Sequence, residues 1–246
     1  MKIINLHDIH NRFEVLEKTL HRIEEDYRGE NMKPILTFCG DFLNSPEDKH
    51  NGKLILEIMR DMIWEMEDKG FQTIVTPGNH DVGSNGIFYS KSDHERFYSI
   101  FQLQKDQINY IEQEGIYIIA IDSTADSDTT FMAAGKIGEE QLQELEQLCI
   151  RIGKEVPKIV IMHHHPIKRA SHLDSKGMEL VDAEQYRAIA RQNNVILTLH
   201  GHRHSYQGLY DGRGILTFTS GRMRNDLKYS VVEIRNQEEV WASYWR

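Results

Sequence analysis

The sequence of 246 residues has few cysteines and no long hydrophobic run. Its 2 cysteines, Cys39 and Cys149, are too few and too far apart for the disulfide framework of a small secreted protein, so we expect both to be reduced and buried. No uncharged apolar run approaches the roughly 20 residues that a membrane-spanning helix needs. The N-terminal segment reaches His7 and Asp8 after one short apolar run, which is too short and too polar for a signal peptide. We therefore expect a soluble, cytoplasmic protein without a membrane partner.

Positive charge is also scarce, because 29 lysines and arginines face 38 aspartates and glutamates, for a formal net charge of −9. Non-specific binding to nucleic acid depends on cations that neutralise phosphates, so extended nucleic acid is not an expected partner. The charge balance still leaves room for a local basic patch. The abundant residue type is histidine, with 13 copies, most of them crowded into a few short segments.

The length favours one large domain, since a typical domain has about 150 residues and no linker, internal repeat or low-complexity segment divides the chain. A domain of this size buries roughly three quarters of the surface that its unfolded chain exposes, and so it needs no disulfide or structural metal to fold. We predict a single domain over residues 1–246.

Apolar runs rich in β-branched residues alternate with segments of helical period, which predicts a layered α/β fold. The predicted strands are Lys2–Leu6, Ile35–Cys39, Gln72–Thr76, Ile116–Ile121, Lys158–Met162 and Val195–Leu199. The predicted helices are Arg12–Tyr27, Leu54–Lys69, Asp93–Gln102, a helix that begins with Glu139 and Glu140, and Glu179–Gln192. From Gly208 onward, short strands separated by turns predict an antiparallel tail and hence mixed sheets; they are Ile215–Thr219, Tyr229–Ile234 and Val240–Tyr244.

Five polar clusters directly follow predicted strands, where open α/β sheets usually bind ligands. In chain order they are Asp8-Ile9-His10, Gly40-Asp41, Gly78-Asn79-His80-Asp81, His163-His164-His165-Pro166 and His200-Gly201-His202-Arg203-His204. One such motif alone is common by chance and would indicate a surface turn or a core histidine. Five in order, each after an apolar strand, indicate a shared site.

The residue types in these clusters suit metal ions. Asp8 and His10 stand at positions i and i+2, which point the same way on extended backbone, and His202 and His204 have the same spacing. A carboxylate can bridge two metals through its two oxygens, and Asp41 in its glycine-led turn is the candidate. Imidazole together with carboxylate and amide oxygens suits manganese, iron or zinc rather than calcium. The clusters therefore predict a two-metal hydrolytic centre.

The motifs DIH, GD followed by Asn44, GNHD, HHP and GHRH resemble the signature blocks of the calcineurin-like metallophosphoesterase superfamily. The resemblance covers about Lys2 to His204. Within the superfamily, the segments IDST, EEQLQELEQL, HHHPI and GHRH are similar to the cyclic-nucleotide phosphodiesterase-like branch. The resemblance implies an α/β fold in which two mixed β-sheets lie between helices, a four-layer αββα sandwich, with a dinuclear metal site between its loops.

The resemblance also implies a role for each motif residue. One metal would be held by Asp8, His10, Asp41 and His204, and the other by Asp41, Asn79, His164 and His202. The choice of His164 over His163 follows from the H-x-P pattern of the family. His80 matches the catalytic histidine that contacts phosphate and assists the leaving group, and Asp81 is its expected orienting partner.

The expected function is hydrolysis of a phosphoester, in the first place a diester of a nucleotide-type substrate, by water activated on two divalent metal ions. Manganese is the first expectation, and iron, zinc, cobalt or nickel suits the same ligands. The alternatives are a phosphomonoesterase or protein phosphatase, a nuclease, and a non-catalytic metal-binding scaffold.

Substrate selectivity is expected in two loops without periodicity, Ser123–Gly138 and Ile167–Gly177. Residues that flank the motifs and could bind substrate, although solvated surface or loop packing explains each of them better, are the cations Arg12, Lys168, Arg169, Arg203 and Arg222 and the aromatics Phe131 and Tyr206.

Overall fold

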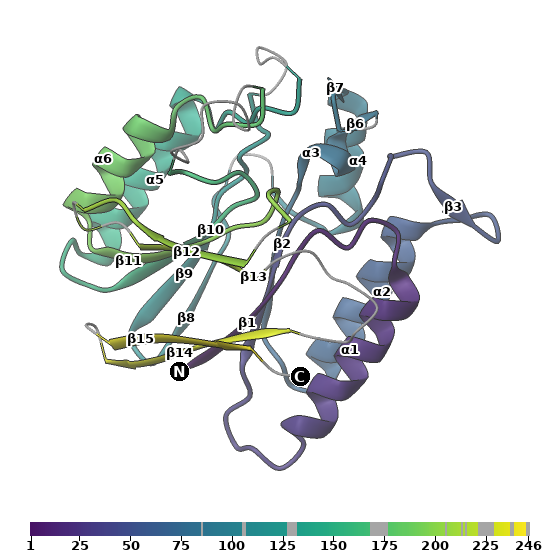
Figure 1. The fold of residues 1–246 in the computed structure, drawn as a ribbon, viewed down its shortest axis with the longest axis horizontal. Helices are drawn as coiled ribbons and strands as arrows, with labels where there is room; N and C mark the ends of the chain where they lie inside the picture. The colour runs from purple at the N-terminus through teal and green to yellow at the C-terminus, as the bar shows by residue number, and fades with distance from the viewer. Residues whose placement is uncertain are drawn as a thin grey trace.

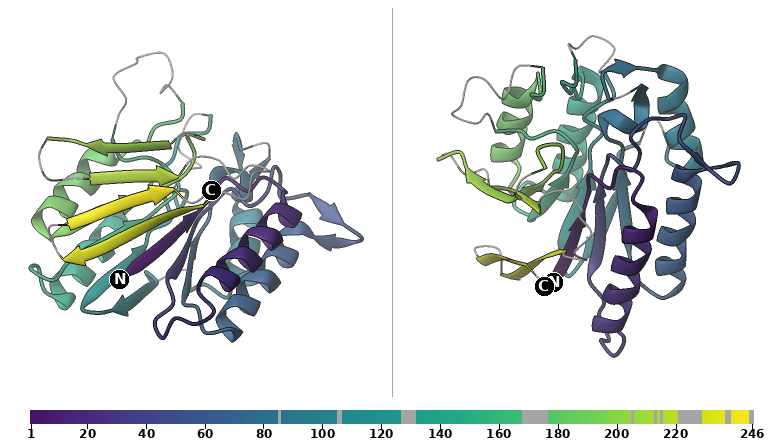
Figure 2. Two further views of the ribbon diagram at one scale, coloured as in Figure 1. Left: turned by 60° about the horizontal axis from the view of Figure 1, so that its bottom comes forward. Right: turned by 45° about the vertical axis from the view of Figure 1, so that its right-hand side comes forward.

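The computed structural model describes residues 1–84, 86–104, 107–126, 132–167, 177–204, 206–212, 214, 216–220, 229–236 and 239–244. Two large β-sheets face each other, with helices on their outer faces (Figures 1 and 2). The predicted αββα sandwich with two mixed sheets is confirmed.

The first sheet has five strands in the order β15-β14-β1-β2-β5. Its strands are β1 (Lys2–Leu6), β2 (Ile35–Cys39), β5 (Thr73–Thr76), β14 (Ser230–Asn236) and β15 (Glu239–Tyr244). β1 pairs in parallel with β2 and β2 with β5, whereas β14 is antiparallel to both β1 and β15. Since parallel strands end at the same edge, the segments after β1, β2 and β5 emerge side by side.

The second sheet has six strands in the order β12-β13-β11-β10-β9-β8. They are β8 (Tyr110–Gln113), β9 (Ile116–Ala120), β10 (Lys158–Ile161), β11 (Val195–Leu199), β12 (Tyr206–Tyr210) and β13 (Leu216–Ser220). The predicted antiparallel tail needs one correction, because β13 runs parallel to β11 and only its other neighbour, β12, is antiparallel. Two short hairpins complete the strands, β3 (Lys49–His50) with β4 (Lys53–Leu54) and β6 (Gly83–Ser84) with β7 (Phe88–Tyr89).

The helices divide between the two outer faces. The core on the outer face of the first sheet contains side chains of α1 (Phe13–Asp26), α2 (Ile55–Asp68) and α4 (Lys91–Ile100). The second sheet is covered by α5 (Glu139–Ile152) and α6 (Ala183–Gln192). The short helix α3 (Asn79–Val82) begins three residues after β5 and carries the GNHD motif. The long predicted helices therefore all form, with ends shifted by a few residues.

Successive residues of the central strands point to different cores, as the two-residue period of a strand requires. In β1, Ile4 packs toward the helices and Ile3 toward the opposite sheet; in β10, Val160 and Ile159 divide in the same way. Both faces of these strands are therefore apolar, which explains their nearly continuous hydrophobic sequence. Cys39 lies between the sheets and Cys149 on the buried face of α5, and both are buried and free, as predicted.

Candidate metal centre

The five polar clusters meet at one edge of the sandwich, and backbone hydrogen bonds tie their loops together. The amide of Asp8 donates to Gly40 O at 3.1 Å, and the amide of His10 donates to Asp41 O at 3.0 Å. In the second sheet, the amide of Gly201 donates to His163 O at 3.1 Å. Neighbouring loops of each sheet are thus held together, and the backbone N–H of His202 links the two sheets by donating to Oδ1 of Asp8 at 3.0 Å.

Five of the predicted ligands have left-handed backbone, with φ of 52° at Asp8, 48° at His10, 57° at Asp41, 69° at His202 and 50° at His204. This region is uncommon for residues other than glycine. The extended backbone expected for the two i, i+2 pairs is therefore wrong, since these residues lie in turns beyond β1 and β11. Strained backbone of this kind persists where surrounding contacts impose it, and it is concentrated at functional sites.

A close contact between two glycines brings the Asp41 loop to the GNHD motif. Gly40 has a φ of +75°, and a Cβ atom added there would lie 2.3 Å from the backbone nitrogen of Gly78. A Cβ atom on Gly78 would lie 2.3 Å from Oδ1 of Asp41. The glycine before each motif is therefore required sterically, and the amide of His80 can donate to Oδ1 of Asp41 at 2.9 Å.

Asp8, His10, Asp41 and His204 form the first group of potential ligands, with one donor atom from each lying within 4.8 Å of the others. The Nε2 atoms of His10 and His204 are 3.0 Å apart, and Nε2 of His10 lies 3.7 Å from the carboxylate of Asp41. His204 is the most open member, with 39% of its side chain exposed. This is the set that the sequence assigns to one metal.

Asp8 is oriented by two neighbours that the sequence did not reveal. Its Oδ2 lies 2.8 Å from Nδ1 of His7, whose Nε2 is 3.2 Å from the hydroxyl of Thr219 in β13. Its Oδ1 accepts the backbone N–H of His202 at 3.0 Å. Contacts of this kind fix the direction of a carboxylate ligand. In the sequence, only the position of His7 next to Asp8 could have indicated that it orients this carboxylate.

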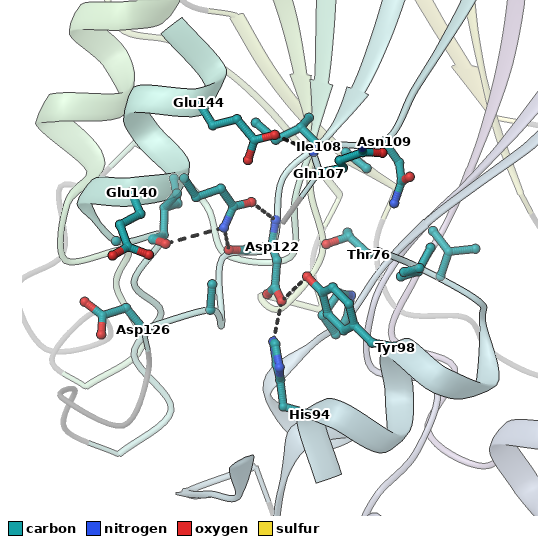
Figure 3. A pocket seen from close by; sticks show the side chains of 18 of the residues that line it. Thr76, His94, Tyr98, Gln107, Ile108, Asn109, Asp122, Asp126, Glu140 and Glu144 are labelled. Atoms are coloured by element: carbon teal, nitrogen blue, oxygen red, sulfur yellow. Dashed lines mark hydrogen bonds and ion pairs between the residues drawn. The ribbon is translucent and has the colours of Figure 1, made fainter. Parts of the chain in front are cut away.

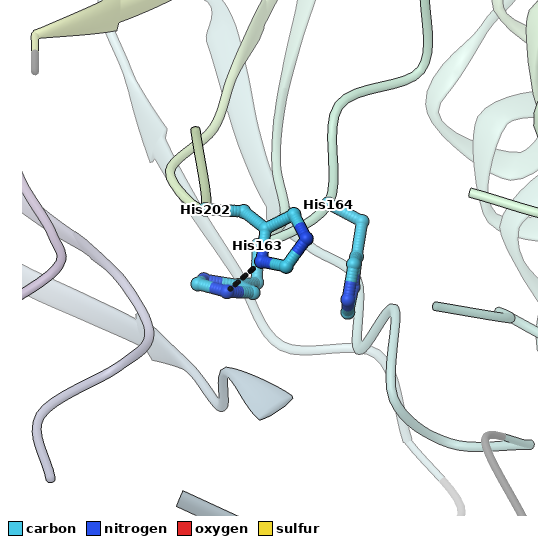
Figure 4. A group of neighbouring side chains, drawn as sticks. All are labelled: His163, His164 and His202. Carbon is cyan, nitrogen blue, oxygen red and sulfur yellow. Dashed lines mark hydrogen bonds between the residues drawn. The ribbon is translucent and has the colours of Figure 1, made fainter. Parts of the chain in front are cut away.

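The second group of potential ligands converges on Nε2 of His163, which lies 2.9 Å from Oδ1 of Asn79, 3.2 Å from Nδ1 of His202 and 3.3 Å from Oδ2 of Asp41. Figure 4 shows His163 and His202 in contact, with His164 alongside. The amide of Asn79 is turned by its own hydrogen bond, in which Nδ2 donates to Gly86 O at 2.9 Å. Asp41 therefore belongs to both groups, as a bridging residue would.

The neighbouring His164, which the H-x-P pattern selects, faces other partners. Its Nδ1 lies 2.8 Å from the hydroxyl of Ser123 and its Nε2 lies 3.1 Å from Ala133 O. One of its nitrogens is still within 4.8 Å of donor atoms of His163 and His202. The structure thus brings His163, rather than His164, against Asn79 and Asp41.

His80 and Asp81 do not contact each other in the expected way. Nδ1 of His80 lies 2.9 Å from Asn44 O, and the His80 ring meets the ring of His10 edge-on, with centroids 4.8 Å apart. The Asp81 carboxylate instead accepts backbone N–H groups of Asp41 at 2.8 Å, Gly78 at 2.9 Å and Leu43 at 3.0 Å. The expectation that Asp81 orients His80 is corrected, because consecutive residues of α3 point in different directions.

The buried ionisable groups of the centre shift one another's pKa values. Burial disfavours the imidazolium of His163, but the carboxylates of Asp41 and Asp8 and the contact with Cys39 O together outweigh burial and raise the pKa of His163 to about 9. Burial likewise opposes ionisation of Asp41, yet His163 holds the pKa of Asp41 well below 3.8. Burial and then repulsion from Asp41 raise the pKa of Asp81 to about 7. The centre therefore gathers negative charge and requires a positive one.

The donor set fits a divalent cation. Nδ1 of His163 must donate to Cys39 O at 2.7 Å, since a carbonyl only accepts, which leaves Nε2 pointing at a carboxylate and an amide oxygen. The lone pair of Nε2 would repel these two oxygens, so the arrangement is favourable only when a further proton or a metal cation lies at Nε2. In the part of the chain that the structure describes, the buried Nε2 of His202 has no hydrogen-bond partner. Imidazole, carboxylate and amide donors together suit a borderline metal.

The cations and aromatics that flank the motifs, for which solvated surface or loop packing was the better explanation, are only partly described. Arg12 and Arg203 are half-buried near the ligand loops, and Nη1 of Arg203 lies 3.5 Å from the sulfur of Met178. Lys168, Arg169, Arg222 and Phe131 lie outside the described residues, and Tyr206 belongs to β12 without a described side chain.

A second feature of this region is a cavity of about 610 Å³, whose lining includes Thr76 and Pro77, the residues just before the GNHD motif (Figure 3). Its walls include Asp122, which accepts from His94 at 2.7 Å and from Tyr98 at 2.9 Å, and the carboxylates of Glu140 and Glu144. None of the predicted ligands lines it. The cavity is therefore separate from the two donor groups.

The sequence matches a model of the calcineurin-like phosphoesterase family over residues 1–206. The chain belongs to this family. The predicted resemblance is thus confirmed for the superfamily, while the narrower phosphodiesterase-like branch stays a prediction. No curated protein sequence matches the chain. Among the described residues, no helix of this calcineurin-like phosphoesterase has the length and apolar character needed to cross a membrane.

Solved structures show the same fold at low identity. A dimetal phosphatase from Danio rerio has 11% identity and a TM-score of 0.70, over 98% of both chains. A protein from Thermus thermophilus has 15% identity and a TM-score of 0.62, over 98% of this chain and 97% of its own. A 5'-nucleotidase from Candida albicans has 14% identity and a TM-score of 0.57, over 99% of this chain and 50% of its own. At such identities the likeness establishes the fold of this calcineurin-like phosphoesterase.

Proposed function

We propose that this protein hydrolyses phosphoesters with two divalent metal ions held by the two donor groups. The observation that carries the proposal is that both groups share the Asp41 carboxylate while His80 stands at their edge. Two bound cations would neutralise charge on phosphate oxygens and lower the pKa of a coordinated water. The residues of the chain supply the rest of the site.

The proposed ligands are Asp8, His10, Asp41 and His204 for one metal and Asp41, Asn79, His163 and His202 for the other. His163 takes the place that the sequence pattern gives to His164, because its Nε2 faces Asn79 and Asp41. Three of the ligands have a second contact that fixes their direction, with His7 beside Asp8, Gly86 O beside Asn79 and Cys39 O beside His163. We expect manganese to occupy both positions, and iron, zinc, cobalt or nickel suits the same donors.

His80 is the proposed general acid. Its Nδ1 must donate to Asn44 O, so Nε2 is the nitrogen free to act at the substrate. The contact with the ring of His10 places His80 beside the first group of ligands. From this position Nε2 can hold a proton against the leaving oxygen as the phosphorus–oxygen bond breaks, which is ordinary general-acid catalysis by histidine.

The proposed substrate is a small phosphoester, with a nucleotide-type diester as the first candidate. The net charge of −9 disfavours a nuclease that binds extended DNA. A monoesterase is the second candidate, because the similar folds include a dimetal phosphatase and a 5'-nucleotidase.

The test compares hydrolysis of bis-p-nitrophenyl phosphate with that of p-nitrophenyl phosphate by chelator-stripped protein refilled with manganese. We expect faster cleavage of the diester, and a drop in kcat of about 100- to 10,000-fold in His80→Ala with the metal content unchanged. Faster cleavage of the monoester would make the protein a phosphatase. Full metal content without turnover of either ester would overturn the proposal and favour a metal-binding scaffold.

A further inference from the structure

His164 follows the proposed ligand His163 after the end of β10, and it lies against the loop 123–138. It is fully buried, and its ring is perpendicular to that of the proposed ligand His163, with centroids 5.0 Å apart. Since the two rings point in different directions, His164 meets a different set of atoms from His163. Those atoms belong to the described ends of the loop, residues 123–126 and 132–138.

Three hydrogen bonds connect His164 with this loop. The backbone N–H of His164 donates to the hydroxyl of Ser123 at 3.0 Å, and the same hydroxyl lies 2.8 Å from Nδ1 of the ring. Nε2 lies 3.1 Å from Ala133 O and must carry the proton, because a carbonyl only accepts. Both ring nitrogens therefore have loop partners, and neither presents a free lone pair to a metal.

The packing around the ring is equally tight. A Cβ atom added to Gly135 would lie 2.2 Å from Nδ1 of His164 and 2.6 Å from Ser123 O. Glycine is therefore required at 135, since any other side chain would collide with the imidazole. The loop backbone at Gly135 therefore lies directly against the ring.

The same segment holds a second loop. Gly135 donates its N–H to Glu179 O at 2.9 Å and accepts the N–H of Val181 at 2.9 Å, while the N–H of Lys136 donates to Ser123 O at 2.8 Å. Residues 133–136 thus form a short ladder with 179–181, and His164 connects this ladder to β10. The described part of the loop 123–138 therefore depends on this connection.

We propose that His164 is a positioning residue, which fixes the described ends of this loop, residues 123–126 and 132–138, beside the metal centre through Ser123 and Ala133 and is not itself a metal ligand. Its effect on substrate rests on the proposed function, whereas its effect on the loop and on metal content does not. Activity, loop protection and metal content therefore have to be measured separately.

The first test uses His164→Ala together with two conservative variants. His164→Gln keeps a donor near the position of Nε2 for Ala133 O, and His164→Asn keeps a polar atom near Nδ1 for Ser123. We expect His164→Ala to keep two metals per chain, to lose hydrogen-exchange protection at residues 133–136, and to raise KM by about 3- to 10-fold for each hydrogen bond lost, with a smaller change in kcat. The conservative variants should each restore part of both losses.

The second test uses Ser123→Ala, which removes the same hydroxyl from the other side. Because the two residues share one contact, the double variant should raise KM less than the product of the two single effects. His21→Ala, on the exposed face of α1, is the control and should change neither protection nor KM.

Two results would overturn the inference. One is the loss of one metal per chain in His164→Ala, measured by elemental analysis, while His163→Ala keeps two. The other is unchanged exchange at residues 133–136 in His164→Ala. An inactive wild-type protein with normal metal content and loop protection would contradict the proposed function and leave the positioning role standing.

Discussion

The carboxylate of Asp81 accepts the backbone N–H of Asp41 at 2.8 Å, so one acid of the site determines where the other stands. Its remaining hydrogen bonds, from Gly78 and Leu43, fix the backbone on both sides of the close glycine contact. Asp81 therefore has a structural role, because it fixes the backbone of the loop that carries Asp41.

Asp81→Asn replaces one acceptor oxygen by an amide that cannot accept, and at least one buried N–H loses its partner. We expect the free energy of unfolding of the metal-free protein to fall by about 1 to 3 kcal/mol, together with weaker metal binding. Denaturant titration and chelator competition measure the two effects. Unchanged stability and metal affinity with reduced turnover would instead restore Asp81 as a partner of His80.

His7→Ala removes the group that contacts Oδ2 of Asp8. Loss of such a supporting contact weakens metal affinity by about 10- to 100-fold, and we expect this range for the metal held by the group that contains Asp8, in a competition with a coloured chelator. Thr219→Val, which removes only the outer contact to Nε2 of His7, should have a smaller effect. Equal affinity in wild type and His7→Ala would show that Asp8 does not depend on His7.

Gly86→Ala tests how closely α3 is fitted to its surroundings. Gly86 has a φ of +69°, and a Cβ atom there would lie 2.5 Å from Nδ2 of Asn79 and 2.6 Å from Nε2 of His80. We expect kcat to fall by more than about 10-fold, because displacements near 1 Å at a reacting group have effects of this size or larger.

The matched control for Gly86→Ala is Gly52→Ala. Gly52 also has a positive φ, +81°, but no atom lies within 4 Å of an added Cβ. This control carries the backbone strain without the collision, so it should lose about 1 kcal/mol of stability and keep its activity. Equal kcat losses in the two variants would assign the effect to strain alone.

Lys158→Met tests a structural role far from the site. The buried ammonium of Lys158 donates to Gly153 O and Val156 O at 2.7 Å and to Asn193 O at 2.9 Å, which joins the turns after α5 and α6. Methionine fills similar volume but leaves these carbonyls without that donor. We expect the free energy of unfolding to fall by about 2 to 5 kcal/mol by denaturant titration, with KM unchanged. A loss below about 0.5 kcal/mol, on the order of a surface substitution, would contradict this role.

The sequence was sufficient to predict most strands of the αββα sandwich and the loops that carry the site, but it did not reveal β8 or β12. Apolar strands are recognisable by composition, and polar groups placed after parallel strands must meet at one edge. Local backbone was harder, since the left-handed turns at Asp8 and His202 replace the extended backbone inferred from spacing. Those turns are imposed by hydrogen bonds such as that from Asp8 to Gly40 O, which no local pattern reveals.

Side-chain partners were the least accessible from the sequence. In the run His163-His164-His165, residue type and order do not say which ring faces Asn79 and which faces Ser123. Only the packing of Gly135 and Ala133 against the second ring distinguishes them. The same holds for Asp81, whose partners are backbone amides up to 40 positions away.

The two donor groups take residues from both sheets, and His10 and His204 in the first group are 194 positions apart in the chain. A metal ion coordinated by both residues would join the two halves of the sandwich at one end, as a covalent cross-link would. Any cation bound only by the folded chain adds stability that grows with its concentration. The melting temperature of this protein should therefore rise with each tenfold increase in free manganese. The stability of the association between the two sheets then depends on the concentration of metal around the protein.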